Sequence, residues 1–407
     1  MIVILGAALL LAGMPSLAEA QRSGEPSAAP SPGAADAAAG ASAFGLDVYR
    51  SLAPRDGNLF ISPVSAADVL AMAYAGAAGD TAAAFEGTLK IPLKGEKLLS
   101  GWSDLRRSLA AAAGEGAELS LAGSLWPDSS AKLKPAFLRS AERSFDSAVI
   151  PQEFAKGGEA PRLAINEWAE RETKGRVKDL ITAPLPTDTR LVLAAAVYFK
   201  GEWKESFDRA ETKPGSFRAP SKRVKADFMR RTGPFGYLED GLGQVLEIPY
   251  RGKRLSMFVL LPKPGKGGMA ALEASLAGEL LGPRLDGAAV LRVDASLPRF
   301  SFSWGTESLR EVLAGLGLSR AFGGEADFSG MTGDRSVKIS DVLHRAFVDV
   351  TEEGTEAAAA SAAVVTRALP PSRPKAFKAD RPFVFLIMDR DTGAILFLGR
   401  LDDPSAP

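Results

Sequence analysis

The chain has 407 residues, of which 46% are hydrophobic and 8% aromatic, so it can build one large core or two ordinary domains. Its 49 basic and 49 acidic residues cancel, and no excess field attracts nucleic acid or an anionic membrane. The sequence has no cysteine and only one histidine, His344, which makes disulfides, thiolate sites, most catalytic triads and histidine-rich metal sites hard to build. We therefore expect a globular protein without a metal or other cofactor.

The first 43 residues divide into two segments that we do not expect to form part of a folded domain. Residues 1–20 form a short apolar run that ends in small residues at Ala18 and Ala20, which is typical of a secretion signal cleaved after Ala20. Residues 21–43 are rich in Ala, Ser, Gly and Pro, a composition that predicts a flexible tether. The sequence thus predicts a secreted protein, extracellular or periplasmic, without a membrane span.

From Phe44 onward the chain alternates helical and strand patterns without a second linker, so we predict one domain over residues 44–407. A capping serine followed by proline begins a buried helix that includes Ala66 to Tyr74. A second helical pattern runs from Ile165 to Ile181 and is interrupted at Gly175.

Strand patterns become more frequent toward the C-terminus. Leu191 to Phe199 and Leu255 to Leu261 are continuous apolar runs of strand length, which predicts interior strands. Phe383 to Met388 and Ala394 to Leu398 flank a turn-rich spacer that ends in glycine, which predicts a hairpin. Helices early and strands late indicate an α+β fold.

The stretch from Glu352 to Pro371 does not fit a core element, because it begins with a run of small side chains and ends in prolines. Taken alone, it could be an alanine-rich surface helix or a plain linker. However, strand-like residues Phe347 to Thr351 precede it and the apolar C-terminal hairpin follows it. A long loop of small residues between two core elements is uncommon unless it is functional.

Read with the two-residue period of a strand, this stretch has one face of small, uncharged side chains. That face consists of Thr355, Ala357, Ala359, Ser361, Ala363 and Val365, whereas Glu356 falls on the other face. Such a segment can enter a sheet because no bulky or ionised group obstructs its burial. From Thr355 to Ala368 it would span roughly 46 Å at about 3.3 Å per residue. About ten new hydrogen bonds, at about 1 kcal/mol each, would stabilise the inserted state before entropy is subtracted.

Several separated motifs occur in a recognisable order along the chain. They are Asn58 to Ser65, Asn166-Glu167-Trp168 with Thr173 and Gly175, Tyr198 to Trp203, Asp327 to Met331, Glu352 to Ala360, and Phe377 to Phe385. With these motifs, essentially all of residues 44–404 resembles the serpins, a family of serine protease inhibitors. The resemblance implies an α+β serpin fold with three β-sheets, eight or nine helices and a reactive-centre loop exposed above the large sheet.

The resemblance also implies a mechanism in which the chain is an inhibitor and not an enzyme. A serine protease, or in some cases a cysteine protease, attacks the loop and forms an acyl-enzyme, and the cut loop then inserts into the large sheet so that deacylation stalls. The loop hinge would comprise Gly354, Thr355, Glu356, Ala357, Ala358, Ala359 and Ala360. The expected partner is therefore a target protease, bound by a monomer, and not a nucleic acid.

The family spacing from Gly354 implies that the reactive bond joins Ala368 to Leu369. The alternative is the bond between Arg367 and Ala368, which a loop one residue shorter would select. Ala368 before the cut bond favours elastase-like or subtilisin-like proteases, whereas Arg367 would favour trypsin-like enzymes.

The resemblance further implies a sheet-opening region that consists of Glu352, Arg299, Trp203, His344 and Ser62. Glu352 would pair with Arg299 at the top of the large sheet, and His344 would lie beneath the sheet. The asparagine that usually accompanies this histidine is replaced by Ala195, so Ser62 or water would have to compensate.

Two other functions compete with inhibition. Ser129 to Lys132 satisfies the Ser-x-x-Lys pattern of penicillin-recognising enzymes, but the Lys-Thr-Gly and Ser-Asp-Asn motifs are missing. Alternatively, the chain is a serpin-fold protein that no longer inhibits and serves as protease substrate, carrier or chaperone. Such members tend to carry bulky or charged residues in the hinge, and the inserting face of this hinge has none, so the sequence favours inhibition.

Overall fold

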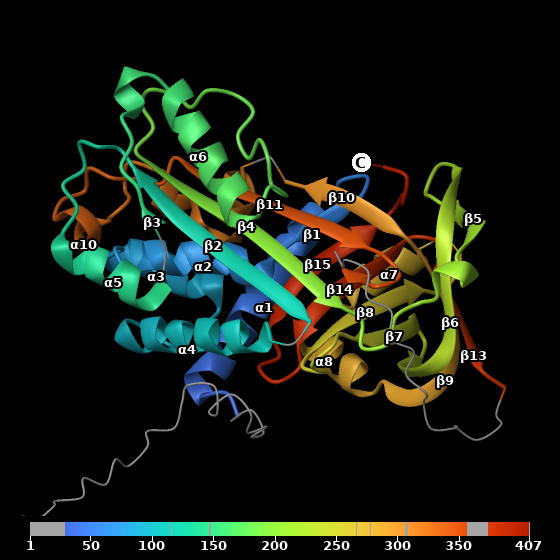
Figure 1. Cartoon of the computed structure of the whole chain (residues 1–407). Helices are drawn as coiled ribbons and strands as arrows, with labels where there is room; N and C mark the ends of the chain where they lie inside the picture. The colour runs from blue at the N-terminus through green and yellow to red at the C-terminus, as the bar shows by residue number, and fades with distance from the viewer. Residues whose placement is uncertain are drawn as a thin grey trace, which may run out of the picture.

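The computed structural model describes residues 29–114, 116–145, 148–265, 267–276, 278–305, 308–355 and 373–406. Within these ranges the chain is a mixed α+β structure, with α-helices and β-strands packed together (Figure 1). The helices are α1 (Pro32–Leu52), α2 (Pro63–Tyr74), α3 (Gly79–Leu89), α4 (Glu96–Ala112), α5 (Pro135–Phe145), α6 (Glu159–Glu172), α7 (Gly268–Ala274), α8 (Gly278–Asp286), α9 (Arg310–Leu313) and α10 (Ser329–Thr332).

One sheet has six strands among the described residues. Their order is β10 (Phe300–Trp304), β11 (Asp341–Val350), β12 (Gly354–Thr355), β4 (Leu191–Glu202), β2 (Ala117–Pro127) and β3 (Ala148–Val149). Strand β4 is buried on both faces from Leu191 to Phe199, which explains why its sequence is apolar without alternation. We refer to these six strands as the large sheet, because they form the sheet into which the loop is expected to insert. The other hydrogen-bonded sheet has more strands.

The remaining strands form a nine-stranded sheet. Its order is β1 (Leu59–Ile61), β15 (Ile395–Leu401), β14 (Phe383–Asp389), β8 (Leu255–Pro262), β7 (Gly243–Pro249), β6 (Arg223–Glu239), β9 (Ala289–Pro298) and β13 (Lys375–Lys378), with β5 (Lys213–Arg218) paired to β6. The long β6 joins two regions, because its first half pairs with β5 and its last residues pair with β7. In Figure 1 the strands β5, β6, β9 and β13 stand together at one end of the molecule. The expected fold has three sheets. Here two of them are joined by hydrogen bonds through β6, so they form one continuous nine-stranded sheet.

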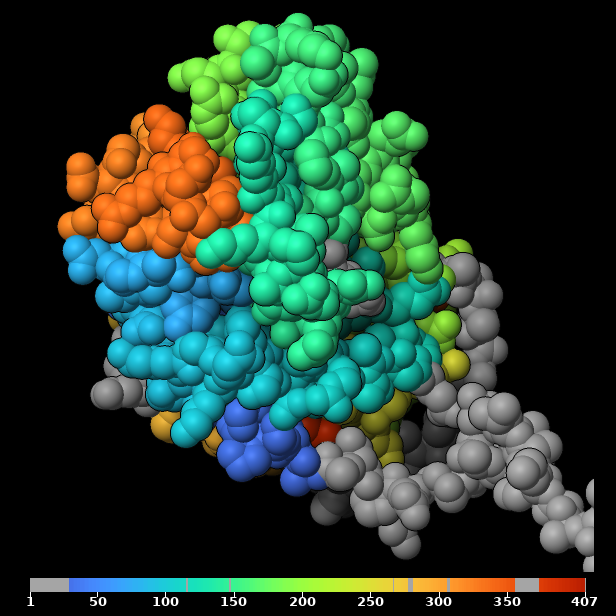
Figure 2. All heavy atoms as spheres, turned by 90° about the vertical axis from the view of Figure 1, so that its left-hand side faces the viewer, coloured from blue at the N-terminus to red at the C-terminus, as the bar shows by residue number. Residues whose placement is uncertain are grey.

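The two faces of the large sheet contact different layers. Helix α6 covers one face, where Trp168 and Ile165 form an apolar cluster with Val192, Ala194 and Ala196 of β4. The opposite face belongs to the main core, in which residues of β4 lie with those of α1 and α2. Figure 2 shows that α3, α5 and the segment around α10 join into one surface at the left-hand end of Figure 1, opposite to β5 and β6.

Several predicted elements are confirmed. The strand predictions correspond to β4 and β8, and β14 pairs antiparallel with β15 as the predicted hairpin. The helix predicted around Ala66 to Tyr74 is α2, and Ser62 caps it by accepting a hydrogen bond from the Ser65 N–H at 3.2 Å.

The interruption predicted at Gly175 is confirmed, because α6 ends at Glu172, whereas the helical pattern predicted beyond it to Ile181 was wrong. The backbone enters the left-handed region at Lys174, with φ of 53°, and at Gly175, with φ of 81°. These two residues turn the chain away from the helix axis. Val177 and Leu180 are nevertheless fully buried beside α6, so their apolar pattern reflects a packed loop.

The flexible tether predicted over residues 21–43 was wrong for Pro32 to Ala43, which lie in α1. Ser31 begins this helix by accepting a hydrogen bond from the Ala34 N–H at 3.2 Å, and Pro32 occupies its first turn. Alanine is the best helix former, and small side chains permit the close approach to α4 that buries them. The folded region therefore begins before Phe44.

The predicted signal peptide at residues 1–20 lies outside the described residues and stays a prediction. Among the described residues, no helix is both long and apolar enough to cross a membrane.

Two alanines of α1 test whether this segment is packed or loose. Ala38 is fully buried whereas its neighbour Ala39 is exposed. Ala38→Asp should lower the free energy of unfolding by about 3 kcal/mol or more, because it places a carboxylate in the core, and Ala39→Asp should cost less than about 1 kcal/mol. Urea unfolding of both variants measures the difference. Equal stabilities would mean that residues 32–43 do not pack.

Candidate reactive loop and sheet-opening site

The candidate site begins where the small-residue segment leaves the large sheet. Strand β12 lies between β4 and β11, with Thr355 opposite Gly201 on one side and Val350 on the other. Farther along, β11 pairs directly with β4, from Asp341 opposite Val192 to Ala346 opposite Val197. The first residues of the segment thus already separate β4 from β11 at one end, although these strands are joined over the rest of their length.

The hinge residues fit closely into this position. Thr355 is 2% exposed, and its hydroxyl lies 2.7 Å from that of Tyr250. A Cβ atom added to Gly354 would lie only 2.0 Å from the Gly201 carbonyl oxygen, at a φ of 156°. A glycine is therefore required for the segment to approach β4 at this point.

Glu352 and Arg299 are brought together, as the resemblance implies. The Glu352 side chain is only 3% exposed, and its Oε2 lies 3.6 Å from Nε of the half-exposed Arg299. The Thr212 hydroxyl donates a hydrogen bond of 2.6 Å to Glu352 Oε1. A buried carboxylate needs such partners, so breaking both would leave a costly unpaired charge.

Trp203 lies at the same edge of the large sheet. Its indole Nε1–H donates to the Thr351 carbonyl at 2.9 Å, and its backbone N–H donates to the Glu353 carbonyl at 2.8 Å. Its ring stacks on that of Tyr250, with centroids 4.6 Å apart. Tyr250 therefore contacts both Trp203 and Thr355, a link between the hinge and the sheet edge that sequence reasoning missed.

His344 lies on β11 directly opposite Ala195 of β4. Its Nε2 accepts a hydrogen bond from the Ser62 N–H at 3.0 Å, so the proton of the neutral ring is on Nδ1. Nδ1 is buried and has no partner among the residues that the structure describes, because Ala195 offers no acceptor. Burial lowers the pKa of His344 to about 4. Ser62 thus compensates for one ring nitrogen only.

The remaining predicted site residues are not described. Glu356 to Ala360, Arg367, Ala368 and Leu369 all fall within residues 356–372, outside the described ranges. The chain is described again from Arg373, and β13 pairs in parallel with β9 of the nine-stranded sheet. The two ends of the segment are therefore held by different sheets.

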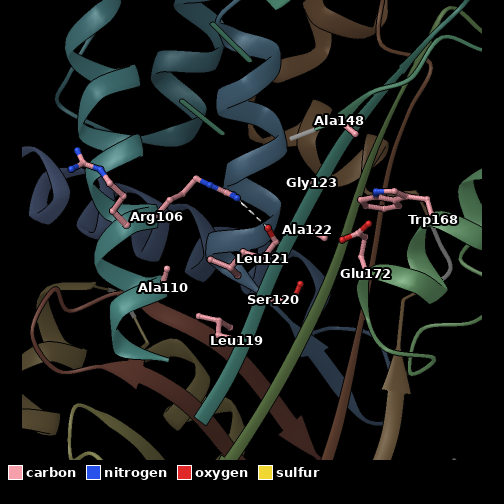
Figure 3. Close-up of a pocket in the computed structure, with 11 residues that line it drawn as sticks. Arg106, Ala110, Leu119, Ser120, Leu121, Ala122, Gly123, Ala148, Trp168 and Glu172 are labelled. Carbon is pink, nitrogen blue, oxygen red and sulfur yellow. Dashed lines mark hydrogen bonds between the residues drawn. The ribbon is translucent and has the colours of Figure 1, made fainter. Parts of the chain in front are cut away.

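A cavity of about 420 Å³ lies beside β2, and its lining includes Arg106 and Leu121 (Figure 3). The Arg106 guanidinium on α4 donates to the Leu121 carbonyl at 3.4 Å and to the buried Asp68 of α2 at 2.7 Å. Trp102 also donates to Asp68, whose pKa is raised by burial although Arg106 opposes the shift. This group joins β2 to two helices, and no sequence motif indicated it.

The Ser-x-x-Lys segment lies in the turn that follows β2. Ser129 and Lys132 are exposed there, and the Ser130 hydroxyl donates to Asp128. Within the described part of the chain, no hydrogen bond joins Lys132 to Ser129, so the pair is not assembled as a catalytic site.

Comparison with known proteins identifies relatives over nearly the whole chain. The family model described as "Serpin (serine protease inhibitor)" matches residues 39–404. An uncharacterised serpin-like protein of Thermococcus kodakarensis is 38% identical over 89% of this chain and 84% of that protein. The leukocyte elastase inhibitor of Bos taurus is 37% identical over 89% of this chain and 97% of that protein.

Solved structures agree with this relation. Human thyroxine-binding globulin in complex with thyroxine matches with a TM-score of 0.83 and 28% identity, over 92% of this chain and 100% of that chain. Serpin48 of the insect Tenebrio molitor, described as highly specific, matches with a TM-score of 0.80 and 29% identity, over 89% of this chain and 97% of that chain.

The burial of His344 predicts a pH dependence of stability that can be assigned to one residue, since it is the sole histidine. Its pKa is about 4 in the fold and about 6.5 when unfolded, so the unfolded chain binds more protons between these values. The contribution of the neutral His344 to the free energy of unfolding is fully present above about pH 6.5 and is lost as the pH falls toward 4. From pH 7.5 to 4.5 the loss should be roughly 2.5 kcal/mol.

Urea unfolding of the parent and of His344→Gln at both pH values measures this term, since glutamine keeps an acceptor for Ser62. The parent should lose roughly 2.5 kcal/mol more than the variant. An equal loss in the two proteins would contradict the assignment to His344.

Proposed function

Because the chain belongs to the serpin family, we propose that it is a suicide-substrate inhibitor of serine proteases that works by inserting its cut loop into the large sheet. The observation that carries this proposal is the position of Thr355, buried between β4 and β11 with its hydroxyl against Tyr250. Insertion would continue a strand that has already begun.

The register of β12 predicts where the inserted residues would lie. Strand β12 is antiparallel to both β4 and β11. Each inserted residue after Thr355 would therefore lie opposite the residue one position earlier in sequence, counted from Gly201 on β4 and from Val350 on β11. Ser361 would therefore arrive between Ala195 and His344, on the same face of the sheet as Thr355. Its hydroxyl could accept the hydrogen bond that His344 Nδ1 lacks.

The same register supports burial of the predicted small face. Ala357, Ala359, Ser361, Ala363 and Val365 would point to the main core, as Thr355 does. Before this can happen, the direct ladder between Asp341–Ala346 and Val192–Val197 must open. The inserted strand would then pair with β4 on one side and with β11 on the other. Two ladders of backbone hydrogen bonds would replace the single β4–β11 ladder, which is a net gain.

Among the relatives are both a named protease inhibitor and a named carrier, so they support inhibition as well as the alternative of a carrier. The name of the leukocyte elastase inhibitor supports an elastase-like target, which agrees with Ala368 before the cut bond. Thyroxine-binding globulin supports the alternative of a serpin-fold carrier. The hinge of small residues favours inhibition, because a carrier has no need of an insertable strand.

We also propose that the protein is not an enzyme, that it acts as a monomer, and that it is exported after cleavage behind Ala20. Export is supported by the apolar run in residues 1–20 and is tested by sequencing the N-terminus of the mature protein, which should begin at Gln21.

Incubation with pancreatic elastase, subtilisin and trypsin should yield, with at least one enzyme, a complex that survives SDS at the summed mass. Thr355→Arg should abolish the complex and leave a cleaved substrate, because it adds a charge to a buried position of the inserting face. Ala376→Arg is the matched control, since it adds the same charge at an exposed position of β13 on the other side of the loop. Complex formation that is equal in the two variants would contradict insertion.

The reactive bond can be located by mass spectrometry of the C-terminal peptide released from the reaction mixture. A new N-terminus at Leu369 is expected, with an elastase-like or subtilisin-like enzyme as the target. An N-terminus at Ala368 would instead support cleavage after Arg367 by a trypsin-like enzyme, and would show that the loop spacing from Gly354 was wrong.

A further inference from the structure

A cavity of about 560 Å³ is lined by none of the hinge residues that the structure describes. Several separate segments meet there, namely the connection after α1, the turn after β5, the loop before α7, the start of β14 and the end of β15. Its volume is in the range of small-molecule sites in proteins. It does not share lining residues with the hinge or with the cavity beside β2.

The apolar portion of this cavity is made largely of rigid side chains. Five prolines line it together with Met269, and they are Pro54, Pro220, Pro262, Pro264 and Pro382. A proline ring presents apolar surface without a backbone N–H, and its restricted φ keeps the wall in place. Such walls suit a flat or ring-shaped apolar group and need little reorganisation to receive it.

The charged portion of the lining is basic. Five basic and two acidic side chains line the cavity, and one of the acids, Asp402, lies 2.9 Å from Nε of Arg400. Arg218 and Arg381 share a single carboxylate, Asp380, at 2.9 and 3.4 Å. Burial lowers the pKa of Arg381, Asp380 opposes the shift, and the neighbouring Arg218 lowers it further. The single negative charge of Asp380 therefore balances only part of the positive charge of Arg218 and Arg381.

Lys263 adds a further cation at the rim of the cavity. It is exposed at the rim, and no described residue forms a hydrogen bond or an ion pair with its ammonium group. Its backbone is fixed, because its N–H donates to the Leu242 carbonyl at 3.0 Å. An ammonium on a flexible stem can reach an anion bound over the prolines.

The floor of the cavity is preformed. The buried Arg400 donates to the carbonyls of Ala53, Arg55 and Gly57 at 2.6 to 3.0 Å, and so fixes the connection after α1. The Arg381 guanidinium donates to the Pro262 carbonyl at 2.6 and 3.1 Å, which joins the start of β14 to the end of β8. The shape therefore does not depend on a bound molecule.

We propose that this cavity binds a small amphipathic organic anion, such as an aromatic carboxylate or sulfonate, with its apolar body on the proline and Met269 walls and its anionic group near Lys263, Arg218 and Arg381. The proposal is independent of protease inhibition, since the cavity shares no residue with the loop hinge.

The test uses the intact chain and anilinonaphthalene sulfonate as the probe, followed by fluorescence titration without any protease. Lys263→Glu should weaken binding at least tenfold, because it replaces an attractive charge by a repulsive one. Lys97→Glu on α4 is the matched control, with the same change at an exposed position outside the cavity, and it should leave the affinity unchanged. The uncharged analogue phenylnaphthylamine should bind at least tenfold more weakly than the sulfonate.

A second readout locates the bound probe. With carbon-13 methyl-labelled methionine, the Met269 signal, assigned by its loss in Met269→Leu, should shift and saturate at the dissociation constant found by fluorescence. A stationary Met269 signal, or equal affinities of Lys263→Glu and Lys97→Glu, would overturn the proposal. Either result leaves the proposed inhibition by loop insertion unaffected, because no step of the measurement involves the loop.

Discussion

The structure depends on one pairing, that of Gly354 and Thr355 between β4 and β11. At this end of the large sheet the segment separates two strands, whereas over the rest of their length those strands bond directly to each other. The fold therefore holds a sheet in which β4 and β11 are already separated at one end, and the sequence that follows Thr355 has small side chains on one strand face. Glu352, Trp203 and Tyr250 secure this position through an ion pair, a carbonyl hydrogen bond and a hydroxyl contact.

If the loop inserts as proposed, the same geometry would explain why the intact form persists although insertion would add backbone pairing. Insertion requires the β4–β11 ladder to break before new bonds form, so the cost comes first and the gain later. An uncut loop is held at both ends, by β12 in the large sheet and by β13 in the nine-stranded sheet. Cleavage, if it occurs as proposed, would release one end. His344 lies in the ladder that must open, and its unpaired Nδ1 is a local weakness that an arriving serine hydroxyl would remove.

Much of the fold could be predicted because its signals are local. The interior strands are apolar runs, α2 has a serine cap, and the C-terminal hairpin has a glycine-ended turn. Residues 32–43 were missed although Ser31, Pro32 and the alanines are local helix signals, because the low content of large side chains was taken to mean that the segment cannot pack, whereas small side chains allow helices to approach closely. The C-terminal end of α6 was missed because Val177 and Leu180 continue an apolar pattern in a loop that is not helical.

The candidate site was only partly predictable for a related reason. Motifs marked Glu352, Arg299, Trp203 and His344, but not Thr212, Tyr250 or Arg106, since these three act through contacts between distant segments. Ala195 showed that an acceptor was missing, and only the structure shows that the Ser62 backbone satisfies the other nitrogen.

The most direct test of insertion is the thermal stability of the protein before and after a single cut within residues 356–372. About ten added hydrogen bonds at about 1 kcal/mol each predict that the cut protein melts higher than the intact one, by roughly 10 to 15 °C. If calorimetry finds the same midpoint for both forms, or a lower one after the cut, the segment does not become a strand of the large sheet.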